Sequence, residues 1–203
     1  MTPTPRPWPG IGLRLLLVLA LQVVALGWMV MSRAEILRNG TEVTLAVVPV
    51  DPRDLFRGDF VRLRYDISNL RPGVIGGDSD FRINDPIWVV LDTSLAGAAR
   101  PTGVFKHHPP ALPDRAVIRG RVQSIYDGPP PIDDPEGCPN PCTTLGIDYG
   151  IEQYFVPEGE GRKLEDLRND SRVSVVAAVD GNGRAAIKRL LVDGVERYSE
   201  PLF

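Results

Sequence analysis

The residues from Leu15 to Met31 form an apolar run without a charged side chain, and Gln22 is its only strongly polar member. A transmembrane helix needs about 20 predominantly apolar residues, with a lower limit near 17, so the run is long enough to cross a bilayer. Arg6 and Arg14 precede the run, and the first acidic residue is Glu35. Because positive charge is retained in the cytoplasm, we predict a single-pass anchor with a cytoplasmic N-terminus and an exported C-terminal part.

A cleaved signal peptide is the alternative, because Ser32-Arg33-Ala34 places small residues at the spacing that signal peptidase favours. The apolar run is longer than the 7–15 residues of a usual signal-peptide core. Ile36 and Leu37 continue the pattern, and Asn39-Gly40 then supply a helix stop. We therefore predict an uncleaved membrane anchor helix over residues 11–38, after a cytoplasmic tail of residues 1–10, with the lipid bilayer as its first partner.

The remaining chain, residues 41–203, has the features of a mainly β, antiparallel domain. The protein contains 20 glycines and 20 prolines and has no long helical pattern after the anchor, which favours short strands with frequent turns. Strands are predicted at 43–47, 61–67, 87–91, 103–105, 116–125, 145–151, 172–179 and 185–192, with one short helix at 163–168. Asp180-Gly181-Asn182-Gly183 predicts a hairpin between the last two strands. The net charge of −3 argues against nucleic acid as a partner.

The clearest alternation joins Val61, Leu63, Tyr65 and Ile67 on one strand face, so we predict that Leu63 and Tyr65 are core residues. Leu63-Arg-Tyr65-Asp-Ile67 is echoed by Ile147-Asp-Tyr149-Gly-Ile151. Two explanations are open for the echo. One is an internal duplication that gives repeat units at 41–112 and 115–195, packed side by side. The other is chance similarity between strands rich in aromatic and aliphatic residues.

The stretch Gly58-Asp59-Phe60-Val61-Arg62-Leu63-Arg64-Tyr65 resembles the motif that gives the GDYXXLXY family its name, with Phe60 where the family has tyrosine. The resemblance extends to residues 51–57, to residues 149–159 and to the anchor. It implies a bacterial inner-membrane protein of unknown activity, with a periplasmic domain and a multi-pass membrane protein as partner. Phe60 has no phenol hydroxyl, so no role of that hydroxyl transfers to this chain.

A dense group of charged residues surrounds the turn before this strand: Asp51, Arg53, Asp54, Arg57 and Asp59. One interpretation is a solvated turn held by ion pairs and carboxylate caps. The other is a polar recognition patch, and these five residues are our candidate binding residues.

A hydrolase of the signal-peptidase type is a further alternative, because a Gly-Asp strand entry behind a membrane anchor is similar to those enzymes. The position of their serine nucleophile corresponds to Val50, and no serine or cysteine occurs between Thr44 and Ile67. Lys188 therefore has no nucleophile to serve as general base. We predict no catalytic residue.

Cys138 and Cys142 are the two cysteines of the chain and enclose Pro-Asn-Pro. In an oxidising exported compartment a local disulfide is expected. Free or redox-active thiols and a metal site completed by His107-His108 are the alternatives. We expect neither a metal nor a cofactor. The sequence thus favours a non-enzymatic accessory or interaction module for a membrane partner, with a membrane-bound hydrolase or a small-ligand-binding domain using the acidic loop at 51–59 as alternatives.

Overall fold

The computed structural model describes residues 9–48, 60–94, 97–110, 112–129, 138, 141–155 and 173–199. The chain divides into two compact units, Met1–Glu35 and Ile36–Phe203. Helix α1 runs over Pro9–Asn39, which confirms the predicted helix over 11–38. Its segment Gly12–Asn39 is 28 residues long, is apolar enough to cross a membrane and has no buried part in its most apolar window. This segment is compatible with membrane anchoring.

The helix ends where the sequence predicts, at Asn39-Gly40. The Gly40 amide donates a hydrogen bond to the Ile36 carbonyl at 2.9 Å, which closes the last helical turn. Ile36 and Leu37 are buried in a small apolar cluster with Ala178 and Ala186. The last helical turn is therefore part of the β unit and contributes to its packing.

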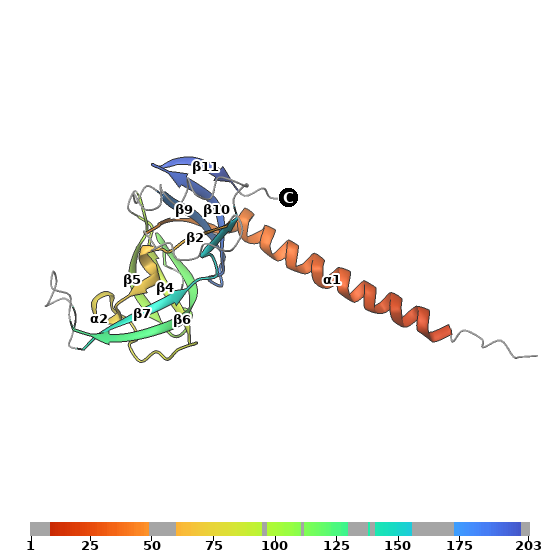
Figure 1. Ribbon diagram of the computed structural model, residues 1–203, viewed down its shortest axis with the longest axis horizontal. Coiled ribbons are helices and arrows are strands. Elements are labelled where there is room, and N and C mark those ends of the chain that lie inside the picture. The colour runs from red at the N-terminus through yellow and green to blue at the C-terminus, as the bar shows by residue number, and fades with distance from the viewer. Residues whose placement is uncertain are drawn as a thin grey trace, which may run out of the picture. The chain divides into compact units, whose positions relative to one another are not determined.

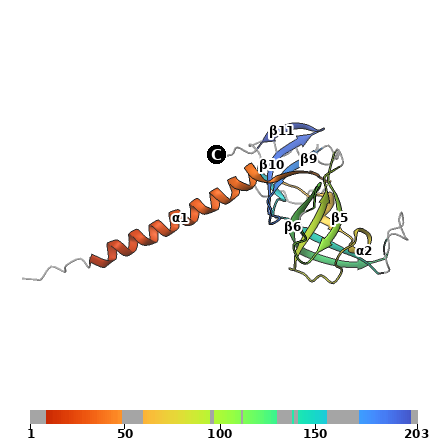
Figure 2. The same cartoon turned by 180° about the vertical axis from the view of Figure 1, so that it is seen from behind.

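The β unit contains two main antiparallel sheets (Figure 1). The four-stranded sheet has the order β1 (Thr41–Ala46), β9 (Val173–Val179), β10 (Ala185–Val192) and β11 (Val195–Ser199). The five-stranded sheet has the order β3 (Asn69–Leu70), β7 (Cys142–Asp148), β6 (Arg115–Gly128), β4 (Pro86–Asp92) and β5 (Arg100–Phe105). Strands β2 (Phe60–Arg62) and β8 (Gln153–Phe155) form a separate pair. Helix α2 (Pro72–Ile75) lies beside the five-stranded sheet, as the view from behind shows (Figure 2).

Both sheets share one hydrophobic core. Its most deeply buried side chains come from both sheets and include Leu45, Ile87, Ile118, Leu145 and Leu190, none of which has accessible surface. Alternation explains this placement, because every second residue of a strand points to the same face. The prediction of a mainly β, antiparallel fold behind one long apolar helix is confirmed.

Most predicted strands are present, with shifted ends. Strands β1, β4, β5, β6, β7, β9 and β10 correspond to the predictions at 43–47, 87–91, 103–105, 116–125, 145–151, 172–179 and 185–192. The predicted hairpin joins β9 to β10, and Asp180 Oδ1 accepts hydrogen bonds from the amides of Asn182 and Arg184 at 2.9 and 2.8 Å. Strands β3, β8 and β11 were not predicted. The predicted helix at 163–168 lies outside the described residues.

The predicted strand at 61–67 is confirmed only for its first two residues. Strand β2 ends at Arg62, and Asp66–Ser68 form a 3-10 turn, η1. The Tyr65 amide donates to the Ser68 hydroxyl at 3.0 Å, and the Ser68 amide donates to the Tyr65 carbonyl, also at 3.0 Å. At Asp66–Ser68 these local bonds take the place of a strand ladder, because serine side chains compete with neighbouring strands for backbone groups. Tyr65 itself retains an isolated antiparallel bridge to Val47.

The strand order also differs from the predicted repeat units at 41–112 and 115–195. Strand β1 of the first segment pairs with β9 of the second, and β3 pairs with β7 in the same way. Each sheet therefore contains strands from both segments, and the segments do not form two separate units side by side. Pairing between distant strands joins them into one domain.

Candidate functional site

The two echoed sequence segments lie against each other. Phe60 is opposite Phe155 in the β2–β8 ladder, and Asn69 is opposite Gly146 in the β3–β7 ladder. The step from Phe60 to Asn69 is as long as the step from Gly146 to Phe155, so one antiparallel register continues through both ladders. Between the ladders the pairing is interrupted, and Tyr65 and Tyr149 lie in this interruption.

Each tyrosine donates a hydrogen bond to the opposite segment. The Tyr65 hydroxyl donates to the Ile151 carbonyl at 2.5 Å, and the Tyr149 hydroxyl donates to the Ile67 carbonyl at 2.7 Å. Tyr65 is 1% exposed and Tyr149 6% exposed. Burial raises the pKa of both phenols above the ordinary value, so both remain hydrogen-bond donors at physiological pH. We call this reciprocal pair the tyrosine clasp.

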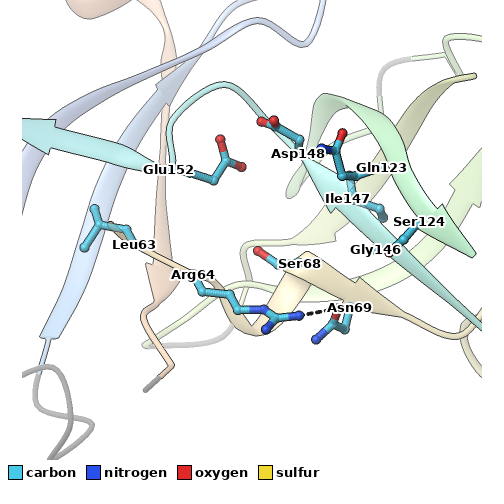
Figure 3. A pocket seen from close by; sticks show the side chains of 10 residues that line it. All are labelled: Leu63, Arg64, Ser68, Asn69, Gln123, Ser124, Gly146, Ile147, Asp148 and Glu152. Atoms are coloured by element: carbon cyan, nitrogen blue, oxygen red, sulfur yellow. Dashed lines mark hydrogen bonds between the residues drawn. The ribbon is translucent and has the colours of Figure 1, made fainter. Parts of the chain in front are cut away.

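A cleft of about 340 Å³ opens at the interruption, and we call it the motif cleft. Its lining comes from three parts of the chain, as Figure 3 shows: the residues after β2, the middle of β6, and the end of β7 with the turn that follows. The lining residues are Leu63, Arg64, Ser68, Asn69, Gln123, Ser124, Gly146, Ile147, Asp148 and Glu152. The cleft thus begins within the motif that the sequence singles out.

Local irregularities in β6 and β7 present polar groups to the motif cleft. The β6–β7 register shifts between Val122 and Ser124, which inserts Gln123 as an extra residue. Gly146 lies opposite Ser124, and a Cβ atom there would be 2.3 Å from the Ser124 hydroxyl. A larger residue at position 146 would therefore have to displace the Ser124 hydroxyl.

Asp148 and Glu152 enclose the turn that follows β7. Asp148 Oδ1 accepts from the Gly150 amide at 2.9 Å, and Glu152 Oε1 accepts from the Tyr149 amide at 2.6 Å. Burial raises the pKa of Glu152 to about 7, and its hydrogen bond to Asp148 together with the negative charge of Asp148 adds to this effect. Near neutral pH the Glu152 carboxyl therefore exchanges a proton readily and can act as donor or acceptor.

Arg64 contributes the opposite charge to the lining. Its guanidinium Nη2 donates to Asn69 Oδ1 at 2.9 Å (Figure 3). In the same view Arg64 and the pair Asp148 and Glu152 come from opposite walls. The cleft can therefore offer a donor wall and an acidic wall to a polar ligand group.

The structure places the sequence-predicted residues as follows. Asp51, Arg53, Asp54, Arg57, Gly58 and Asp59 lie outside the described residues. The backbone of Phe60 belongs to β2. Leu63 and Tyr65 are 2% and 1% exposed, which confirms that both are core residues.

The cysteines and histidines form no shared site within the described part of the chain. Cys138 and Cys142 are joined by a disulfide. His108 packs edge-on against Trp88, with ring centroids 6.5 Å apart. Among the described residues no group of three or more histidine, cysteine, aspartate or glutamate side chains is arranged to hold a metal ion.

Sequence reasoning missed Gln123, Ser124, Asp148 and Glu152 as members of a site. The available signal was the echo itself, because Asp148 and Glu152 flank Tyr149-Gly150-Ile151. The cleft forms only because this segment pairs with the segment that contains the motif. No pattern among neighbouring residues in the sequence indicates such pairing.

Comparison with known proteins identifies a family but no closer relative. The family described as GDYXXLXY protein matches residues 22–190, which is most of the chain. The search of curated proteins and the search of solved structures each found no match.

Proposed function

This chain belongs to the GDYXXLXY family, and from that premise we propose that it is a membrane-anchored interaction module whose motif cleft holds a polar segment of an integral membrane partner. In this proposal α1 is an uncleaved signal anchor in the bacterial inner membrane. The N-terminus is cytoplasmic and the β unit is periplasmic, because Arg6 and Arg14 precede the apolar run.

The observation that carries the proposal is the motif cleft. Arg64, Asn69, Gln123 and Ser124 are exposed, line the cleft and supply both donors and acceptors. The tyrosine clasp fixes the two walls, so the cleft is formed before a partner arrives. Preformed polar sites bind at a lower entropic cost than sites that order on binding.

The chemistry of the cleft supports binding over catalysis. A serine nucleophile needs a base within hydrogen-bond reach. Among the described residues, the Ser68 hydroxyl accepts from a backbone amide, and neither Ser68 nor Ser124 is hydrogen-bonded to a histidine, lysine or carboxylate. Fixed donors and acceptors without an activated nucleophile suit recognition.

Site-directed photo-crosslinking tests the proposal. A photo-reactive residue at Gln123 of the full-length protein, in cells at native expression, should give an adduct with an integral membrane protein. The matched control is Tyr126, which lies on the same strand, is 67% exposed and is not part of the cleft lining. A partner adduct that depends on position 123 and disappears with Ser124→Trp supports the proposal. Equal adducts at both positions, or none at Gln123, contradict it.

Two further measurements test the anchor and its orientation. A reporter that is active only in the periplasm, fused after Phe203, should give signal, and a cytoplasmic reporter at the same position should not. The mass of the mature chain should include the residues before Ala34. A chain that begins at Glu35 would mean that the helix is a cleaved signal peptide.

A small polar ligand is a second candidate occupant of the motif cleft. The volume of about 340 Å³ falls at the lower end of the range for small-molecule sites. Arg64 faces Asp148 and Glu152 across the cleft. This arrangement suits a ligand that carries one negatively and one positively charged group. Purification of the protein with a bound small molecule, lost on Glu152→Gln and Arg64→Gln, would favour this candidate over a protein partner.

A further inference from the structure

A second cleft lies on the other side of Asp148, and three arginines line it. Its volume is about 650 Å³, and Arg119, Arg121, Arg184 and Asp148 are its charged lining residues. We call it the arginine cleft. Asp148 also lines the motif cleft, so the two clefts are neighbours that share this residue.

Strand alternation places two of the arginines. Ile118 and Val122 on β6 are completely buried in the core. Because successive residues of a strand point to opposite faces, residues 119 and 121 lie on the face away from the core. Arg119 and Arg121 are therefore exposed together on the outer face of the five-stranded sheet.

A tight backbone contact brings the third arginine beside them. The Arg119 amide donates to the Gly183 carbonyl at 2.7 Å, which attaches the β9–β10 hairpin to β6. Gly183 has a φ of +83°, and a Cβ atom there would lie 2.9 Å from the Arg119 nitrogen. Only glycine readily adopts this positive φ and also leaves room for the contact with Arg119. The contact fixes Arg184, the next residue, at the edge of the arginine cleft.

Two of the guanidinium groups have partners, and the third has none in the described part of the chain. The Arg119 guanidinium lies over the Trp88 ring, 5.4 Å from its centroid. Arg184 Nε lies 2.7 Å from Asp180 Oδ2. For the Arg121 guanidinium no hydrogen bond, ion pair or ring contact with another described residue exists. The three guanidinium groups outnumber the carboxylates of Asp148 and Asp180, so the arginine cleft and its immediate surroundings carry a net positive charge.

We propose that the arginine cleft binds a phosphate group. Guanidinium groups bind phosphate through paired N–H donors, and they keep their charge at every physiological pH. A phosphate monoester offers three acceptor oxygens, one for each guanidinium, whereas a carboxylate offers two. The source of the phosphate is either a free phosphate monoester or the monoester headgroup of an anionic lipid.

Trp88 provides the readout, because Arg119 packs on its ring. The full-length protein with Trp8→Phe and Trp28→Phe keeps Trp88 as its remaining tryptophan. It is reconstituted in phosphatidylcholine nanodiscs and titrated with glycerol phosphate at constant ionic strength. In a second arm the nanodiscs contain phosphatidic acid, an anionic lipid with a phosphate monoester headgroup, and no free phosphate ester is added.

We expect a saturable change in Trp88 emission in at least one arm. Arg121→Gln should weaken the apparent affinity at least tenfold, and Arg121→Lys should weaken it less. Arg115→Gln is the matched control, because Arg115 is exposed on the same strand and is not part of the cleft lining. A response to glycerol phosphate identifies a free ester, and a response to phosphatidic acid alone identifies a lipid headgroup. Absence of a saturable response in both arms, or equal losses with Arg121→Gln and Arg115→Gln, overturns the proposal.

Discussion

Removal of one hydroxyl group from the tyrosine clasp should destabilise the whole β unit. Tyr65→Phe deletes the donor to the Ile151 carbonyl, and Tyr149→Phe deletes the donor to the Ile67 carbonyl. Both rings are buried, and phenylalanine fills almost the same volume, so neither substitution creates a large cavity. The expected cost is therefore that of one buried carbonyl without its partner, about 1–3 kcal/mol for each substitution.

The double variant tests whether the clasp acts as one unit. Both hydrogen bonds join the same two segments, so loss of the first should loosen the contact that the second needs. The double variant should then lose less stability than the sum of the single variants, by roughly 0.5 kcal/mol or more. Independent hydrogen bonds would instead give additive losses.

Urea unfolding of the full-length protein in mild detergent, followed by near-ultraviolet circular dichroism, measures these changes. Tyr126→Phe is the control, because Tyr126 is 67% exposed and its hydroxyl has no hydrogen bond with another described residue. The control should unfold like the unaltered protein. If Tyr65→Phe and Tyr149→Phe also unfold like the control, the clasp does not stabilise the fold, and our explanation of the motif tyrosine is refuted.

Three further predictions concern the core, the acidic pair and the disulfide. Leu63→Ala should lower the free energy of unfolding by on the order of 2–5 kcal/mol in a urea titration, because Leu63 is 2% exposed. Arg64→Ala should lower it by well under 1 kcal/mol, because Arg64 is exposed. Equal losses would refute the assignment of Leu63 to the core. The pKa of Glu152 is raised to about 7 in the folded chain. At a pH between the ordinary glutamate pKa and about 7, the folded chain therefore holds a proton that the unfolded chain has released. The free energy of unfolding should therefore fall as the pH rises from about 5 to 8, by on the order of 1 kcal/mol after allowance for partial exposure, and Glu152→Gln should flatten this dependence. Reduction of Cys138–Cys142, separated by four positions, should lower stability by no more than about 2 kcal/mol and leave the near-ultraviolet spectrum folded; loss of that spectrum would show a larger role.

The sequence predicts those parts of the fold that depend on neighbouring residues. The apolar run, the stop at Asn39-Gly40 and the alternation in β1 and β6 all have local causes, and the structure contains each of them. The break at Asp66–Ser68 was missed, because the alternation of Leu63, Tyr65 and Ile67 is typical of a strand. Only the hydroxyl of Ser68, bonded to the Tyr65 amide, shows that the backbone turns.

The candidate site was harder to predict, because it depends on contacts between distant residues. Tyr65 and Ile151 are 86 positions apart, and Tyr149 and Ile67 are 82 apart. The echo between their segments was visible in the sequence, but it suggested two separate repeats rather than one interlocked pair. The burial that raises the pKa of Glu152 likewise results from this packing and has no short-range signal.

The pairing of β1 with β9 has a consequence for synthesis. Thr41 lies opposite Val179 and Ala46 opposite Ser174, so β1 leaves the ribosome well over a hundred residues before its partner strand. Until then its apolar residues and hydrogen-bonding edge are exposed, the condition under which unfinished chains aggregate. Ile36 and Leu37 at the end of the helix also remain uncovered until Ala178 and Ala186 have been synthesised. A chain truncated shortly before β9 should therefore leave β1 without its partner strand and be prone to aggregate.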